Sequence, residues 1–311
     1  MARRGNELDV SSSIDTTSPD TVNAEVDRIY QNLYEENSTL LIDQAFRDAN
    51  LLYAGAFPGY HACDTAYHDI QHVLDVTLAM ARLIDGYQRS RAGPEPIGPD
   101  LFSLGVITAL FHDCGYVRRL DDTVHENGAE LTLRHVSIGS AFLHDYFNRL
   151  GMPENAVIAA QLIHFTGYET PVNGIHVPSP IYRLLGSLLG SADIIAQMSD
   201  RCYLEKCRDR LYPEFVAAGI ATKRMPSGED QVVFASGNDL VLKTPNFYEG
   251  ATKRLNVDLG GCHTYVQNHF GGQHLYMEEV DKNIHFAEEL RKDNDASALR
   301  RIPPNTLGEK A

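Results

Sequence analysis

Six side chains with the chemistry of metal ligands lie between residues 72 and 193, each in apolar, helix-like surroundings. Burying an imidazole or a carboxylate among apolar residues is costly unless a partner compensates it. A metal ion held by several such groups is the simplest compensation, and the helices of a bundle can bring them to one point. We therefore predict a metal site built from His72, His112, Asp113, His135, His164 and Asp193.

The adjacent pair His112-Asp113 ends a strongly apolar stretch, residues 101–111. Gly115 follows it, and glycine can adopt the left-handed backbone conformation that ends a helix. Any one of the histidines, taken alone, is more often a hydrogen-bonded core residue. Their occurrence together with two aspartates in apolar surroundings favours the metal site.

The ligand types indicate which ions would fit. Mixed nitrogen and oxygen ligands suit zinc, manganese or iron, and magnesium suits a position richer in oxygen. Four imidazoles and two carboxylates could hold two divalent ions, with Asp113 bridging them. Such a pair of ions activates a water molecule and neutralises the charge that builds on a phosphoryl group.

Composition narrows the class of protein. The chain has 311 residues, of which 43% are hydrophobic, which supports a substantial core. A formal charge of -15 disfavours a nucleic-acid surface but does not exclude a small anionic substrate. The five cysteines form no C-x-x-C pair and are odd in number, as expected of reduced thiols in a cytoplasmic protein. No apolar run approaches the ~18 residues of a membrane helix, and the amino terminus does not resemble a signal peptide.

Apolar periodicity predicts one mostly helical domain over residues 21–311, after a disordered polar tail at 1–20. A short β-hairpin is expected near 231–243, turning at 236–239. The last residues, which are polar and include Pro303 and Pro304, are expected to be loose. The helices are predicted at 21–36, 40–52, 67–87, 99–111, 130–150, 153–164, 181–212 and, with a break, 261–292.

Three short motifs give the chain a resemblance to a known superfamily. The stretch YHDIQHVLDV at 67–76 is similar to the H-N-x-x-H-x-x-D-V motif of cyclic nucleotide phosphodiesterases. Phe111-His112-Asp113 and the Asp193 of Ser-Ala-Asp are similar to later metal-binding motifs of the same branch. Over residues 65–215 the chain therefore resembles the HD superfamily of metal-dependent phosphohydrolases. The resemblance implies an all-α HD-domain helical bundle.

The resemblance also implies roles for individual residues. His68 would be the general acid that protonates the leaving oxygen, a role that suits a histidine near neutral pH. The first ion would be held by His72, His112, Asp113 and Asp193. Asp113 would bridge to a second ion held by His135 and His164. The implied substrate is a small phosphoester, a nucleotide, with a cyclic nucleotide among the candidates.

The chain departs from the phosphodiesterase motif at two places. Asp69 replaces the motif's asparagine, and Tyr116-Val117-Arg118 replaces a further His and Pro-Gly. In the phosphodiesterase branch a glutamine binds the purine base, and Gln197 is the candidate for it in this chain. The HD class is therefore better supported than the cyclic nucleotide substrate.

Two other functions compete with a phosphohydrolase. Some HD-type di-iron oxygenases resemble this set of four histidines and two aspartates, so tightly held iron would favour oxygen chemistry. His68 favours hydrolysis, because oxygen chemistry needs no leaving-group acid. A binding module with a vestigial site ranks last, because no ligand of the set is missing.

Overall fold

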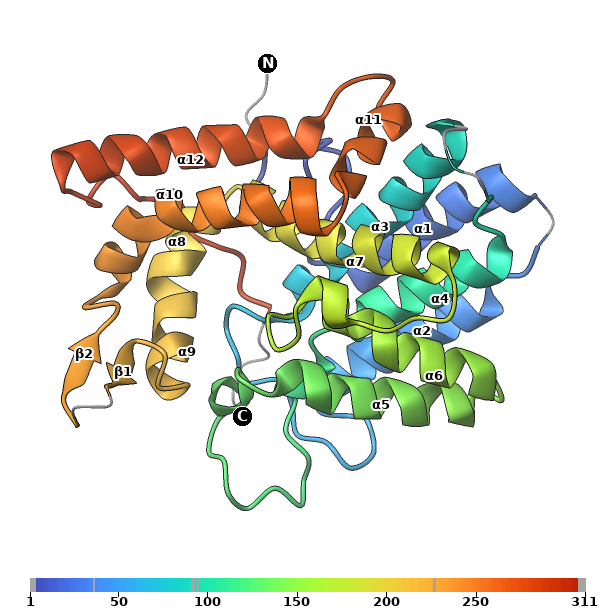
Figure 1. Ribbon diagram of the computed structural model, residues 1–311, viewed down its shortest axis with the longest axis horizontal. Coiled ribbons are helices and arrows are strands. Elements are labelled where there is room, and N and C mark those ends of the chain that lie inside the picture. Colours follow the sequence, from blue (N-terminus) through green and yellow to red (C-terminus); the bar gives the residue numbers. More distant parts are fainter. Residues whose placement is uncertain (1–3, 36, 91–92, 94, 226–227, 307–311) are drawn as a thin grey trace.

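The computed structural model describes residues 4–35, 37–90, 93, 95–225 and 228–306 of the chain. It is mostly helical, with one two-stranded antiparallel sheet (Figure 1). The all-α fold class with a short hairpin is therefore confirmed.

The central helix is α3 (Ile70–Ser90), which is buried along most of its length. It packs against α7 (Pro180–Ser199), α4 (Pro99–Leu110) and α1 (Pro19–Tyr34). A helix that is apolar on most sides, as α4 is, is buried from water only when other elements pack all round it. The metal-ligand candidates on α3 and after α4 therefore lie at the centre of the bundle.

Three further helices complete this half of the molecule: α2 (Leu40–Tyr53), α5 (His135–Arg149) and α6 (Pro153–Leu162). The helix predicted from residue 130 begins instead at His135. Residues 128–131 form a separate 3₁₀ turn, because the Asn127 side chain accepts the Ala129 N–H and Glu130 binds back to the Asn127 N–H. This capping box starts a turn before α5.

The long helix predicted over 181–212 is broken after Ser199. Asp200 adopts an extended conformation, and its carboxylate accepts the Cys202 N–H at 2.6 Å and pairs with Lys206 at 2.5 Å. The chain then continues as α8 (Tyr203–Lys206), a π-helical turn at 207–211 and α9 (Tyr212–Ala217). The break turns α9 away from the axis of α7.

The hairpin lies earlier than predicted, with β1 (Thr222–Arg224) pairing with β2 (Asp230–Val232). The expected turn at 236–239 is instead the start of α10 (Gly237–Lys253). Ser236 caps this helix by accepting the Asp239 N–H at 3.1 Å. Serine, glycine, asparagine and aspartate occur both in hairpin turns and at helix starts, which explains the misassignment.

The carboxy-terminal part adds α11 (Val266–His269) and α12 (Leu275–Asp293). Helix α12 packs on α7 and on α10, and α11 packs on α3. In Figure 1, α10 and α12 run side by side along one edge of the bundle. After α12 the chain turns back toward the centre of the molecule.

Both terminal segments are placed against the bundle, which corrects two expectations. In the tail predicted to be disordered, Asp9 is buried and pairs with the buried Arg82 at 2.6 Å. Residues 1–3 of that tail lie outside the described residues. Near the other end, the carbonyls of Leu299 and Pro303 accept hydrogen bonds from arginines of the π-helical turn. The sequence does not predict this docking because neither segment has a repeating apolar face: polar contacts hold both, together with a few isolated apolar side chains such as Ile14 and Leu299.

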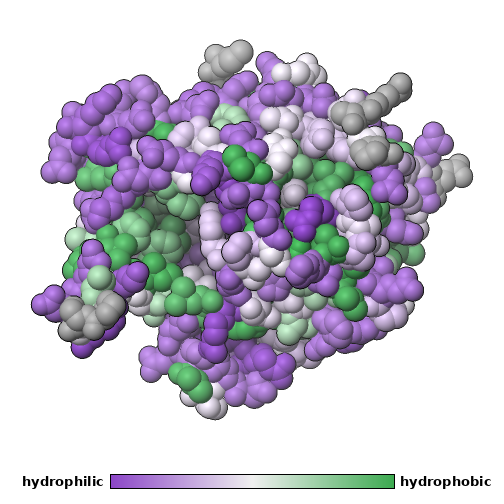
Figure 2. Space-filling model, viewed as in Figure 1, coloured by the Kyte–Doolittle hydropathy of each residue, from purple (hydrophilic) through white to green (hydrophobic). Residues whose placement is uncertain are grey.

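One lobe of the molecule is formed by α9 and the hairpin. The surface is hollowed between this lobe and the central helices, and hydrophobic residues gather on the lobe side of the hollow (Figure 2). The exposed apolar side chains of this lobe include Val216 and Val232. Among the described residues, we find no helix with the length and apolarity needed to cross a bilayer.

Candidate metal centre

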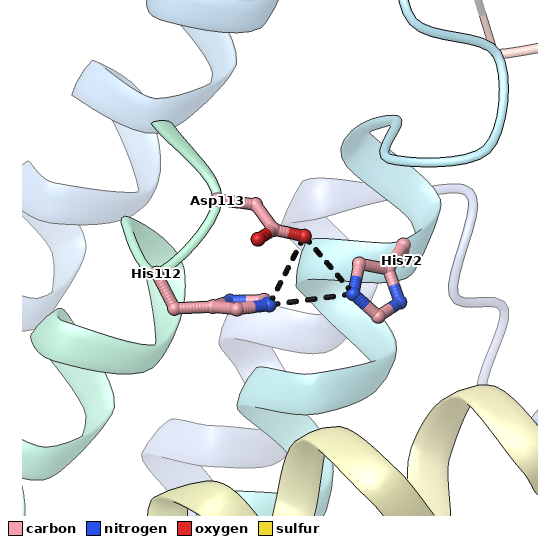
Figure 3. Close-up of side chains that lie close together, drawn as sticks. All are labelled: His72, His112 and Asp113. Atoms are coloured by element: carbon pink, nitrogen blue, oxygen red, sulfur yellow. Dashed lines mark hydrogen bonds and ion pairs between the residues drawn. The ribbon is translucent and has the colours of Figure 1, made fainter. Parts of the chain in front are cut away.

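Three predicted ligands converge in the interior of the bundle (Figure 3). The His72 Nε2 and His112 Nε2 atoms are 3.3 Å apart, and the Asp113 Oδ2 atom lies 3.1 Å from the first and 3.2 Å from the second. Ligand atoms ~2.0–2.1 Å from a tetrahedral zinc ion lie roughly 3.3 Å from one another. The buried His72–His112–Asp113 group could therefore hold a metal ion.

The orientation of His112 supports this interpretation. Its Nδ1 atom lies 2.8 Å from the carbonyl oxygen of Ala109, which can only accept a hydrogen bond. The Nδ1 atom therefore carries a proton, and in the neutral ring the Nε2 atom presents its lone pair to His72 and Asp113. A backbone carbonyl that fixes the tautomer in this way is a common partner of metal-binding histidines.

Asp193 brings a second carboxylate to the same place from α7. Its Oδ1 atom lies 3.5 Å from His72 Nε2 and 3.9 Å from His112 Nε2. One helical turn later, Gln197 donates to Asp193 Oδ1 at 3.3 Å and accepts the Tyr67 hydroxyl at 3.2 Å. Gln197 therefore links the Asp193 carboxylate, through its amide nitrogen, to the Tyr67 hydroxyl, through its amide oxygen, and the purine-binding role considered for it stays a prediction.

His135 approaches the other oxygen of the central carboxylate. Its Nε2 atom is 3.6 Å from Asp113 Oδ1, and its Nδ1 atom lies 2.6 Å from the Thr132 carbonyl. Burial lowers the pKa of His135 although the Asp113 charge opposes this, so the ring is neutral near pH 7. Asp113 thus has one oxygen toward His72 and His112 and the other toward His135, which is the orientation a bridging carboxylate needs.

His164 is the sixth predicted ligand. It lies on a 3₁₀ turn after α6, and its Nδ1 atom is buried without a hydrogen-bond partner. Burial lowers its pKa. Within the described part of the chain, no hydrogen bond or ion pair joins His164 to the cluster, so its role as a ligand stays a prediction.

The electrostatics of the cluster depend on Asp113. Burial alone would lower the pKa of His112, but the adjacent Asp113 charge and hydrogen bond raise it to about 9. Burial opposes ionisation of Asp113, yet His112 and His72 hold its pKa well below the usual range. In the metal-free protein, a proton on His112 therefore balances the carboxylate, and a bound cation would take over that role.

His68, the predicted acid, lies beside this cluster and has its own carboxylate partner. Its Nδ1 atom is 2.6 Å from Glu214 Oε2, and its ring centroid is 5.9 Å from that of His72. Burial would lower the pKa of His68, but the Glu214 charge and hydrogen bond raise it. Glu214 also accepts the Tyr67 N–H at 2.6 Å, which fixes the carboxylate.

Two residues that follow the His-Asp pair shape the site. The Tyr116 ring stacks on the rings of both His68 and His135, with centroid distances of 4.1 and 4.4 Å, and the centroids of the two histidine rings are 6.4 Å apart. Gly115 is not in the predicted left-handed conformation. It is needed for close approach instead, because a Cβ atom there would lie 1.9 Å from the His135 carbonyl oxygen.

Sequence reasoning missed Glu214 and Tyr116. Glu214 lies in α9, 146 residues from His68, which precedes α3, and no local pattern marks it. Tyr116 was noticed only as a departure from a motif. Searches against protein families, curated proteins and solved structures gave no match for this chain.

Proposed function

We propose that this protein is a metal-dependent phosphohydrolase, a phosphodiesterase that acts on a nucleotide. The observation that carries the proposal is the His68–Glu214 pair next to the buried His72–His112–Asp113 group. An acid held beside a metal-binding cluster is what cleavage of a phosphoester with a poor leaving group requires. The resemblance of the sequence motifs to HD phosphohydrolases supports the same reaction class.

The donor set fits divalent ions of the zinc, manganese or iron type, and His72, His112, Asp113 and Asp193 would hold the first of them. Asp113, with an oxygen on each side, would join it to a second ion at His135 and His164. When bound, such ions supply an activated water molecule and neutralise charge on the phosphoryl group.

The protein's own residues provide the proton for the leaving group. The Nδ1 atom of His68 is bound to Glu214, so the Nε2 atom is the one that can donate. The Glu214 charge favours the protonated ring. The backbone of His68 is held by the Thr65 hydroxyl, which donates to its carbonyl at 3.0 Å, and its ring is held by the stack on Tyr116.

The test is a hydrolysis assay on protein loaded with Mn²⁺, Zn²⁺ or Fe²⁺, using a panel of cyclic nucleotides, linear dinucleotides and nucleoside monophosphates. We expect His68→Gln to lower kcat by about 10²–10⁴-fold with metal content unchanged. His285→Gln is the matched control, because His285 is an exposed histidine on α12. The loss should shrink with a 4-nitrophenyl ester, whose leaving group needs no proton.

Two results would overturn the proposal. One is a metal-loaded protein that is inert on the whole panel. The other is an active protein in which His68→Gln behaves as His285→Gln does on nucleotide substrates.

The same preparation tests the di-iron oxygenase alternative, which would use the same four histidines and two aspartates. Tightly held iron with a mixed-valent spin signal and oxygen consumption would favour it. The His68–Glu214 pair favours hydrolysis, because it positions a proton donor that an oxygenase does not need.

A further inference from the structure

The segment 299–306, here called the C-terminal strap, crosses the π-helical turn and reaches the start of α3 (Figure 1). Leu299 accepts a hydrogen bond from Arg208 at 3.1 Å. Pro303 and Pro304 offer their carbonyls to Arg210 at 3.2 and 2.5 Å. The strap is thus held by two arginines of one turn.

Only one of these two arginines also reaches the candidate site. Arg210 Nη1 lies 3.4 Å from the carboxylate of Asp69, and the Thr306 hydroxyl of the strap donates to the same carboxylate oxygen. Asp69 is almost fully buried. Arg208 instead pairs with its neighbour Asp209 at 2.6 Å.

Asp69 in turn holds the backbone of a candidate metal ligand. Its Oδ1 atom accepts the His72 N–H at 3.0 Å, so Asp69 caps the first turn of α3. His68 immediately precedes this cap. Asp69 stands where the motif has asparagine. One of its carboxylate oxygens therefore caps the helix that carries His72, and the other binds Arg210 and the strap.

We propose that the strap positions His68 and His72 through Arg210 and Asp69. The mechanical part of this inference depends on the contacts alone, and its consequence for metal binding and turnover depends on the proposed function. Asp69, Arg210 and Thr306 are positioning residues, because they act on the site through the α3 cap. An asparagine at position 69 could cap the helix but could not form the ion pair.

The first test is hydrogen–deuterium exchange on the full chain in the presence of a chelator, so that it does not depend on a metal. We expect Arg210→Gln and Thr306→Val to speed exchange of the amides in the first turn of α3 by about tenfold, the scale of losing a helix cap. Arg210→Lys should restore part of the protection. Arg208→Gln is the matched control, because it loosens the strap at Leu299 without touching Asp69.

Unchanged exchange in α3 for both Arg210→Gln and Thr306→Val, or an equal increase with Arg208→Gln, would overturn the proposal. Thr306→Val changes one hydroxyl near the chain end, so it remains informative if Arg210→Gln does not fold. A parallel Co²⁺ titration, read by its visible absorption, should show weaker binding and an altered spectrum for the two strap variants only. If the wild type binds no Co²⁺ while the exchange result holds, the metal site fails and the strap coupling stands.

Discussion

At the scale of single residues, the site joins two chemically different groups. One is the cluster of His72, His112 and Asp113, whose short separations suit a cation. The other is His68 with Glu214, whose short contact suits a proton donor. Tyr116 stacks on His68 and so connects the donor to the His135 side of the cluster.

The pH dependence of turnover tests the donor. A general acid must be protonated to act, so the rate falls as pH rises through its pKa. Because Glu214 raises the pKa of His68, we expect Glu214→Gln to move the falling limb of kcat to lower pH. Profiles of wild type and variant measured with one nucleotide substrate would check this, and a limb that stays in place would contradict it.

The stability of the metal-free protein tests the cluster. The pKa of His112 is raised to about 9 from an unfolded value near 6.5. The stabilisation of the folded protein by protonated His112 is therefore fully present below about pH 6.5 and is lost as pH rises through about 9. We expect the free energy of unfolding to fall by up to roughly 3 kcal/mol between these values.

Urea unfolding in a chelator at several pH values measures this fall. In Asp113→Asn the charge that raises the His112 pKa is gone, so this variant should lose much less stability over the same range. A wild type whose stability changes no more than that of Asp113→Asn would show that the buried ion pair does not form.

The six candidate ligands could be chosen from the sequence because polar residues inside apolar runs leave a visible signal. The structure brings five of them together: His72, His112 and Asp113 at the centre, with Asp193 and His135 around them. The partners that orient them, such as the Ala109 carbonyl and Glu214, leave no such signal. A backbone atom has no sequence identity, and Glu214 depends on a long-range contact.

At the scale of helices and turns, the site depends on close approach between the turn after α4 and the start of α5. Gly115 permits this approach, because the His135 carbonyl occupies the space of a Cβ atom. The prediction that Gly115 ends the preceding helix in a left-handed conformation is wrong, and the position requires glycine for close packing instead. The sequence shows that a glycine is present at this position. Only the packing shows that the glycine is needed for close approach and not for a left-handed turn.

We expect Gly115→Ala to lower the free energy of unfolding by roughly 1–3 kcal/mol, as overpacking does. By pushing His135 away from Asp113, it should also weaken a second metal equivalent more than the first. Isothermal titration with Mn²⁺, together with urea unfolding, measures both effects. Gly250→Ala in α10 is the control, because a Cβ atom there meets open space among the described residues. Equal effects of the two substitutions would refute the packing argument.

At the scale of the whole molecule, both ends of the chain are tied to the central helices by buried polar contacts. Asp9 binds Arg82 of α3, and the strap binds Arg210 near the start of the same helix. Hydrophobic periodicity locates helices because their apolar faces repeat. It cannot locate segments held by ion pairs, carbonyls and a few isolated apolar side chains, which is why residues 4–18 and 299–306 are expected from the sequence to be loose.

Removing the amino-terminal tie should destabilise the whole domain. Arg82 is almost fully buried, so Asp9→Ala leaves its charge without a carboxylate partner and should cost about 3–5 kcal/mol. Asp121→Ala, which breaks an exposed pair with Arg119, should give no measurable change. Urea midpoints compare the two variants. A similar midpoint for both would show that residues 4–18 do not dock.

The central claim is that a divalent cation binds between His72, His112 and Asp113, and metal stoichiometry tests it most directly. Elemental analysis of protein purified without added metal, repeated after dialysis against Mn²⁺ and Zn²⁺, should find at least one ion per chain in the wild type. The double variant H72N/D113N, checked for folding by circular dichroism, should retain none. A folded wild type that binds no ion under either condition, or a double variant that binds as much, would contradict the account.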